Sequence, residues 1–131
     1  AHAFEVSGEG SDLRIHRAVC VVDVGRVVNP LGVEAQMMGG TIDGISTALH
    51  LAITLKDGQV QQRNFPDYPL LRMAQAPRSV EVVLVESTEE PCGAGEMGVP
   101  SAAPALANAV YAATTVRVRK LPLMPQLMRM L

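Results

Sequence analysis

The chain has 131 residues, of which 48% are hydrophobic and 18% charged, and its formal net charge is −2. This length suits a single domain over residues 1–131, and the apolar fraction argues against a chain that is disordered throughout. The low net charge, without a stripe of Lys and Arg, argues against a nucleic-acid-binding protein. The apolar runs are too short to cross a bilayer, and the first residues do not resemble a signal peptide, so the compartment stays open.

The first half of the chain predicts two strands and a helix. Phe4–Val6 and residues 13–22 predict strands joined by a turn, because alternating residues give way to a β-branched run. Asn29-Pro30 is typical of a helix start, since Asn caps helices and Pro is tolerated at the first position. We therefore expect a helix over Leu31–His50.

The second half predicts further strands and a second helix. A strand is expected over residues 51–56, followed by the hairpin signal Asp57-Gly58. Residues 80–86 predict another strand, Ser101–Thr114 a helix, and residues 117–123 a short strand. Together these elements predict an α+β fold, with a mostly antiparallel sheet and two principal helices packed on one face.

The first expected helix has an apolar face that glycines interrupt. The apolar residues on that face are Met38, Ile42, Ile45 and Leu49. Gly39, Gly40 and Gly44 each cost about 0.5–1 kcal/mol relative to Ala in a helix interior. Three such penalties predict that another backbone, or a ligand, approaches this face very closely.

A glycine-rich loop carries the strongest candidate for catalysis, Glu96. The loop covers residues 91–100, contains Gly93, Gly95 and Gly98, and leads directly into the second expected helix. Glycines let a backbone approach a ligand, and N–H groups at a helix start can bind an oxyanion. A carboxylate desolvated there can act as a general base. The alternative is an ordinary loop glutamate that the helix dipole favours.

Gln36 is the second candidate, because its amide can both donate to and accept from the edge of a heterocyclic cofactor. The alternative is a solvated helix glutamine. Cys20 is interpreted as a buried core thiol, and Cys92 as a structural thiol or a reactive one near Glu96. The histidines have no metal-ligand spacing, so no protein-held metal is expected, and we interpret them as surface or strand-edge residues: His2, His16 and His50.

Three segments, in this order along the chain, carry motifs that together resemble one family. Asp23–Pro30, continuing to Gly40, is similar to the start of the last helical portion of molybdenum hydroxylase large subunits. Gln62–Arg72 resembles a loop typical of isoquinoline 1-oxidoreductase beta subunits. Gly93–Pro100, followed by Ala103–Ala109, resembles the loop and helix that hold the catalytic glutamate of this xanthine oxidase-like family, which includes the molybdopterin-binding subunits of aldehyde dehydrogenases.

The resemblance implies a molybdopterin-dependent oxidoreductase, in which molybdenum held by a pterin dithiolene carries a water-derived hydroxide. It implies that Glu96 removes the proton of that hydroxide, before the oxygen attacks an electron-poor carbon of an N-heterocycle or aldehyde. It also implies that Gln36 contacts the cofactor, which we expect in a cytosine dinucleotide form. We expect Gly39, Gly40 and Gly95 in the same cofactor-binding site.

Because the family subunit is several times longer, the resemblance implies that this chain is a C-terminal segment of a large subunit. Iron–sulfur clusters are expected on a partner subunit, since the chain has no cysteine motif for them. We expect the isolated segment to be catalytically silent and to self-associate. Met97 and Thr115 depart from the family pattern, which has Pro and Gly there. The alternative is a free-standing binding or assembly domain with vestigial motifs.

Overall fold

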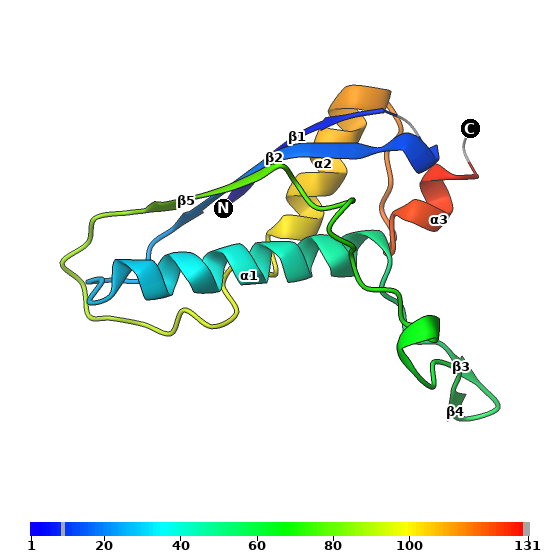
Figure 1. Cartoon of the computed structure of the whole chain (residues 1–131), viewed down its shortest axis with the longest axis horizontal. Coiled ribbons are helices and arrows are strands. Elements are labelled where there is room, and N and C mark those ends of the chain that lie inside the picture. Colours follow the sequence, from blue (N-terminus) through cyan, green and yellow to red (C-terminus); the bar gives the residue numbers. More distant parts are fainter. Residues whose placement is uncertain (9, 130–131) are drawn as a thin grey trace.

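The computed structural model describes residues 1–8 and 10–129 (Figure 1). Its strands and α-helices, in chain order, are β1 (His2–Ser7), β2 (Arg14–Val22), α1 (Pro30–Leu49), β3 (Leu55–Lys56), β4 (Gln59–Val60), β5 (Ser79–Leu84), α2 (Ala102–Thr114) and α3 (Met124–Leu127). Two 3₁₀ helices, η1 (Gly10–Asp12) and η2 (Phe65–Asp67), lie between them. The α+β class and both principal helices are confirmed.

β2 is the central strand of a three-stranded sheet, with β1 on one side and β5 on the other. β1 pairs antiparallel with β2, placing His2 opposite Cys20. β5 pairs parallel with β2, placing Ser79 opposite Arg17. This parallel pair differs from the antiparallel arrangement expected for these strands. Its cause is the crossover through α1, which returns the chain to the end of the sheet where β2 began.

A register shift in the β1–β2 ladder explains which residues of β2 are buried. Glu5 pairs with Arg17 but Val6 pairs with Ile15, so His16 is one extra residue on β2. Such a bulge changes the side-chain alternation. Consequently, Ile15 and Ala18, which are three positions apart, are both buried.

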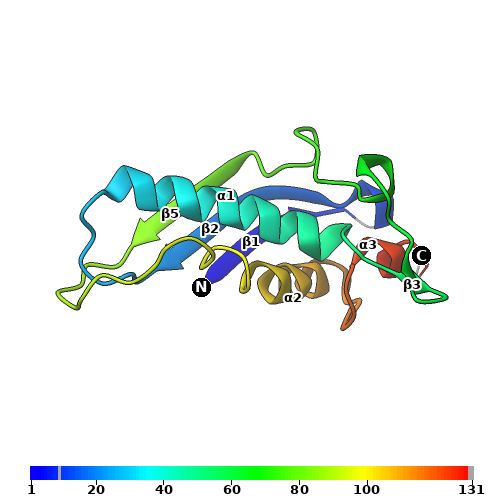
Figure 2. The ribbon, with the colours of Figure 1, turned by 90° about the horizontal axis from the view of Figure 1, so that it is seen from below.

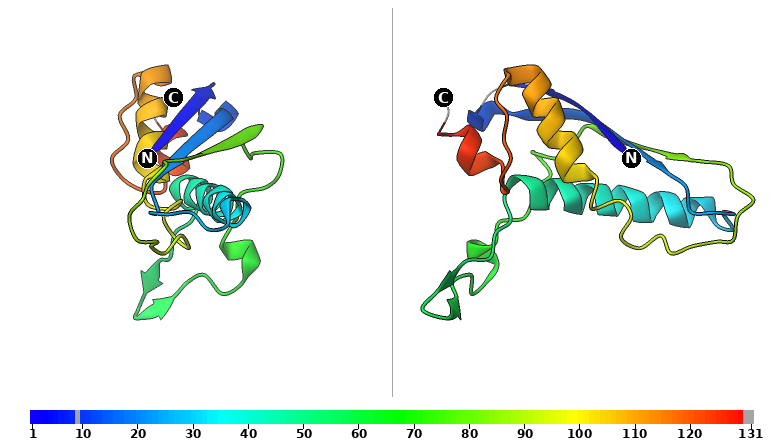
Figure 3. Two further views of the ribbon diagram at one scale, coloured as in Figure 1. Left: turned by 90° about the vertical axis from the view of Figure 1, so that its left-hand side faces the viewer. Right: turned by 180° about the vertical axis from the view of Figure 1, so that it is seen from behind.

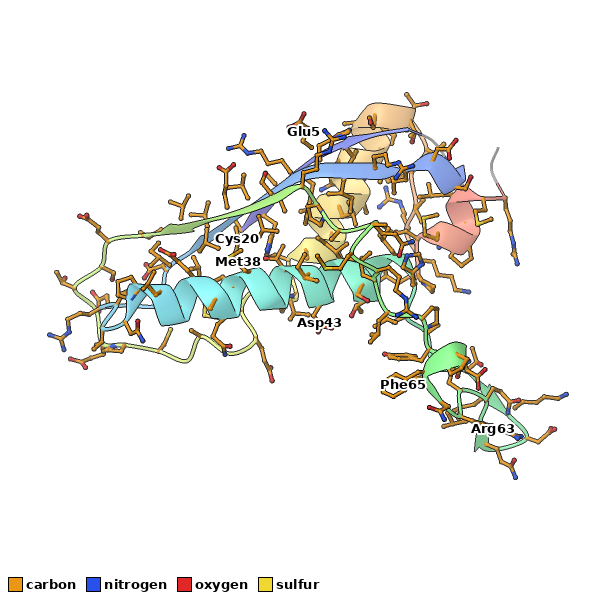
Figure 4. All side chains as sticks on the ribbon, in the orientation of Figure 1. Glu5, Cys20, Met38, Asp43, Arg63 and Phe65 are labelled. Atoms are coloured by element: carbon orange, nitrogen blue, oxygen red, sulfur yellow. The ribbon has the colours of Figure 1, made fainter. Side chains whose placement is uncertain are left out.

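Both long helices cover the same face of the sheet, α1 along β2 and β5 and α2 along β1 (Figures 2 and 3). One group of buried residues, including Ile45 and Leu106, joins the helices to the start of β2. A smaller group, including Met37 and Cys20, joins α1 to the end of β2. Figure 4 shows Cys20 between the sheet and α1. The thiol is buried, as expected from the sequence.

α1 begins as expected, because the Asn29 side chain accepts a hydrogen bond from Gly32 N at 3.2 Å and Pro30 follows. Its buried face differs from the expected one by one position at the start. Met37 is fully buried, whereas Met38 is 44% exposed. The difference arises because the sheet lies against the side of α1 that carries Met37 and Thr41.

Residues 51–69 form an arm that projects from the body of the molecule (Figures 1 and 3). The expected hairpin is present as β3 and β4, with Asp57 in the left-handed region at the turn. The expected strand over residues 51–56 is wrong for residues 51–54, because no strand lies beside them. Thr54 N instead bonds to the Gln62 side-chain oxygen at 2.7 Å. Phe65, at the start of η2 on the arm, is 77% exposed (Figure 4).

The segment after α2 packs against the core without becoming a strand, so the strand expected over residues 117–123 is wrong. Val118 and Leu123 are buried, but no strand of residues 1–8 and 10–129 pairs with this segment. Pro122 has no N–H to offer a ladder. Leu123 N instead donates to Ala48 O at 2.8 Å, which ties the segment to the end of α1. No helix among the described residues is long and apolar enough to cross a membrane.

Candidate functional site

The loop that carries Glu96 is anchored at its beginning to the segment that follows β2. Arg26 N donates to Glu89 O at 2.9 Å, and Cys92 N donates to Val24 O at 3.0 Å. Gly25 is in the left-handed region, and a Cβ there would collide with the Glu90 carbonyl. The Asp23–Arg26 motif therefore forms a turn that holds the loop beside the start of α1.

The end of the same loop crosses α1 at its glycines. A Cβ on Gly40 would lie 3.1 Å from Gly98 Cα, and one on Gly98 would lie 2.8 Å from Met37 O. A Cβ on Gly44 would lie 2.8 Å from Val99 O. Because these neighbours are backbone atoms, larger residues cannot be accommodated by a side-chain shift. The expected close neighbour of this helix face is thus the loop's own backbone at Gly40 and Gly44.

Gly39 differs from Gly40 and Gly44. A Cβ there would meet no atom within 4 Å, and the residue is exposed. The same holds for Gly93 and Gly95 of the loop. These three positions therefore leave the backbone open to the outside, whereas Gly40 is covered by the protein itself.

Glu96 lies on the exposed part of the loop, just before the crossing of α1. Its carbonyl accepts a hydrogen bond from Val99 N at 3.0 Å, which closes a turn over residues 96–99. α2 begins only at Ala102, six residues later. Since the helix dipole acts within the first turn, it contributes little to the Glu96 carboxylate.

A groove of about 240 Å³ lies between the loop and the first half of α1. Its wall is mainly apolar and includes Val27, Val33 and Ala94, with Gln36 and Cys92 also lining it. The structure thus brings Gln36 together with the early part of the glycine-rich loop. Glu96 and Gly95 follow directly along the loop but do not line this groove.

His2 lies on β1, an edge strand of the sheet, which is one of the two positions expected for the histidines, but the contacts of its side chain were not predicted. Instead of lying at the surface, the imidazole is half-buried and bonds to Ser101 Oγ at 2.8 Å and to Thr41 Oγ1 at 2.9 Å. Burial, with the nearby terminal ammonium, holds the pKa of His2 below its usual value. Its ring also stacks on Phe4, with centroids 5.8 Å apart. Only the alternation of β1 hinted that His2 faces the helices, because Phe4 is two positions away on the same side.

Within residues 1–8 and 10–129, no three His, Cys, Asp or Glu side chains are grouped to hold a metal ion. The donor set that is present suits an organic cofactor instead. Gln36 offers an amide donor and acceptor at an apolar groove, and Gly93 and Gly95 leave the adjoining backbone open. These donors are of the kind that can bind the polar edge of a pterin.

Comparison with known proteins gives the family of the chain. The model of the family described as "Molybdopterin cofactor-binding domain" matches residues 1–77. The beta subunit of isoquinoline 1-oxidoreductase from Brevundimonas diminuta is 42% identical over 118 residues, which are 90% of this chain and 15% of that protein. A nicotinate dehydrogenase subunit of Pseudomonas putida is 34% identical, over 90% of this chain and 10% of that protein.

A solved structure agrees with the sequence comparisons. The aldehyde oxidoreductase of Desulfovibrio desulfuricans superposes with a TM-score of 0.75 and 27% identity, covering 90% of this chain and 13% of that one. The chain therefore belongs to the molybdopterin cofactor-binding domain family, which confirms the family resemblance of its motifs. It spans only about a sixth or less of the length of these relatives.

Proposed function

We propose that this chain is part of the large subunit of a molybdenum-dependent oxidoreductase, and that it supplies Glu96 as the catalytic base. The substrate is an N-heterocycle or an aldehyde, hydroxylated with oxygen derived from water. The names of the relatives support this class, since they include an isoquinoline oxidoreductase, a nicotinate dehydrogenase and an aldehyde oxidoreductase.

The observation that carries the proposal is the crossing of the Glu96 loop over α1. The backbone contacts of Gly40 and Gly44 with Gly98 and Val99 fix the end of the loop against a rigid helix. Glu96 precedes this crossing and stays exposed. A general base needs such a defined position, because proton transfer requires hydrogen-bond reach to the reacting group.

When bound, the molybdenum cofactor supplies the water-derived oxygen and takes up the electrons. The part of the reaction that belongs to this chain is proton transfer. The Glu96 carboxylate would accept the proton of the water-derived oxygen, which would make this oxygen a better nucleophile toward an electron-poor carbon. Positioning beside the cofactor and exclusion of water by the substrate are what turn an exposed carboxylate into an effective base.

The remaining site residues would hold the cofactor. The amide of Gln36 donates to and accepts from polar atoms of the cofactor, which we propose in a cytosine dinucleotide form. Gly39 and Gly95 admit the cofactor close to the backbone, since nothing covers either position. For Gly40 we propose an indirect role, because Gly98 occupies the space where its side chain would be.

The proposed active site needs other parts of the enzyme. The groove beside Gln36 has a volume of only about 240 Å³ and is bounded by the segment after β2, the start of α1 and the early part of the glycine-rich loop, so we propose that other parts of the large subunit complete the cofactor pocket. The iron–sulfur clusters that carry electrons away lie on a partner subunit. We therefore expect these 131 residues alone to show no turnover.

The test is substitution of Glu96 in the complete, cofactor-loaded enzyme. Glu96→Gln keeps the size of the side chain but cannot accept the proton, so the rate at which substrate reduces the enzyme falls about 10²- to 10⁴-fold. The molybdenum content, measured on the same sample, stays at the wild-type level. Gln36→Ala, in contrast, lowers the molybdenum content of the enzyme, because the proposed role of Gln36 is contact with the cofactor.

Glu86→Gln is the matched control, since it makes the same change at another exposed carboxylate, just after β5. It leaves both turnover and molybdenum content unchanged. Full molybdenum loading of Glu96→Gln together with near-wild-type turnover would contradict the assignment of Glu96 as the base.

A further inference from the structure

Ser101 is the N-cap residue of α2, but its side chain does not cap the helix. A serine at this position normally accepts a hydrogen bond from a backbone N–H of the first turn. Here the backbone of Ser101 is in the right-handed helical region, and its hydroxyl makes no capping bond. The hydroxyl is bonded instead to His2 Nδ1 at 2.8 Å.

The second bond of the imidazole determines its tautomer. The Thr41 hydroxyl donates its one hydrogen to Met37 O at 2.7 Å, so it can only accept from His2 Nε2, which lies 2.9 Å away. The proton of the neutral ring is therefore on Nε2. Nδ1 is then the acceptor, and the Ser101 hydroxyl donates to it. The lowered pKa of His2 agrees with this neutral form.

These two bonds lie on either side of the loop crossing. Thr41 is next to Gly40 on α1, and Ser101 is two residues after Val99 on the loop. A Cβ on Gly98 would lie 3.1 Å from Thr41 N, so the loop backbone passes directly beside this threonine. The imidazole thus connects the helix to the loop at the point where they touch.

The connection continues to Glu96 through two turns. Ala102 N donates to Val99 O at 3.2 Å, and Val99 N donates to Glu96 O at 3.0 Å. A displacement of Ser101 therefore changes the backbone position of Glu96. Gly93, Gly95 and Gly98 have no side chain, so these three positions of the loop cannot be anchored in this way.

We propose that His2 is a positioning residue, which holds the Glu96 loop against α1 by bridging Ser101 and Thr41. The proposal rests on the proposed role of Glu96 for its effect on turnover. The effect of His2 on the position of the loop does not depend on the role of Glu96. Thr41 and the stacked ring of Phe4 hold the imidazole, and the imidazole in turn holds Ser101.

The test uses His2→Phe and His2→Gln in the complete, cofactor-loaded enzyme. Phe keeps an aromatic ring beside Phe4 but makes neither hydrogen bond, whereas Gln offers an N–H toward Thr41. The first measurement is amide hydrogen exchange at Val99 and Ala102. In His2→Phe we expect exchange there about tenfold faster than in the wild type, and in His2→Gln an intermediate rate.

The second measurement separates kcat from KM. Because a displaced base weakens the chemical step, His2→Phe lowers kcat about 10- to 100-fold and leaves KM close to the wild-type value. His2→Gln partly restores kcat. The matched control is His16→Phe, on the same sheet, because His16 bonds to Ser7 at 2.6 Å and does not touch the loop. It leaves loop exchange and kcat unchanged.

Unchanged exchange at Val99 and Ala102 in His2→Phe would overturn the proposal, whatever the activity. If His2→Phe does not fold, Ser101→Ala removes one of the two bonds from the other side, and unchanged loop exchange in that variant overturns it equally. Faster exchange without any fall in kcat would show that His2 only anchors the loop and would overturn its positioning role. Failure of the Glu96 assignment is recognised separately, by near-wild-type turnover of Glu96→Gln.

Discussion

At the scale of single residues, glycines that are close together in the sequence have different physical tasks. Gly40 and Gly44 give space to the loop backbone, and Gly39 faces open space one position before Gly40. The helix-propensity cost is similar for all three. Only the surroundings therefore decide whether a methyl group at each position stabilises or destabilises the fold.

The pair Gly44→Ala and Gly39→Ala tests this difference. The new methyl of Gly44→Ala would lie 2.7 Å from Ala102 Cβ and 2.8 Å from Val99 O, so the free energy of unfolding falls by about 1–3 kcal/mol. Gly39→Ala only gains helix propensity, so this substitution raises the free energy of unfolding by about 0.5–1 kcal/mol. Urea denaturation at low protein concentration measures both changes. Equal effects of the same sign would contradict the packing role of Gly44.

At the scale of elements, both helices have the positions expected from local signals, but α2 ends at a residue that is unfavourable for its backbone conformation. The expected helices over Leu31–His50 and Ser101–Thr114 are observed as Pro30–Leu49 and Ala102–Thr114. The second ends at Thr115, which has a φ of 62° in the left-handed region. A β-branched residue is rarely found in this conformation, and Gly is the usual residue there.

Thr115→Gly is therefore expected to stabilise the protein. Gly adopts the left-handed conformation without the Cβ penalty, so the free energy of unfolding rises by about 1 kcal/mol. Thr114→Gly is the matched control one residue earlier, where the hydroxyl donates to Val110 O at 2.8 Å and the backbone is helical. That substitution lowers stability by about 1 kcal/mol or more. Thermal unfolding compares the two, and a loss of stability in Thr115→Gly would show that strain at this C-cap is absent.

At the scale of the whole molecule, several large apolar side chains are exposed to solvent. Leu55 and Phe65 on the arm and Met73 beyond it are more than 70% exposed, and Val83 on β5 is 49% exposed. β5 is also an edge of the sheet and can pair with another strand. Together with these exposed side chains, the unpaired edge of β5 favours contact with another protein chain.

The isolated chain is accordingly expected to self-associate. Light scattering of the 131 residues should give a mass above that of the 13.9 kDa monomer, increasing with concentration. Val83→Lys places a charge on the edge strand and reduces the association, because a Lys discourages strand pairing there. A stable monomer of the unchanged chain at high concentration would refute this expectation.

Glu96 and Gln36 can be proposed as site residues from the sequence, because glycine spacing and the family motifs are local patterns. His2 cannot, because its partners Thr41 and Ser101 are 39 and 99 positions away. The same limit applies to β5, whose parallel partner is set by the crossover rather than by its own residues.

Local signals along the chain suffice to locate both helices, to place a hairpin at Asp57-Gly58, and to predict the close neighbour that the first long helix has at Gly40 and Gly44. Each of these depends on residues within a few positions of each other, where caps, turns and periodicity act. The folded chain was needed to reveal that this neighbour is the Glu96 loop, and that His2 joins α1 to it. Those contacts form between segments far apart in the chain, so their geometry depends on how the sheet and both helices pack together.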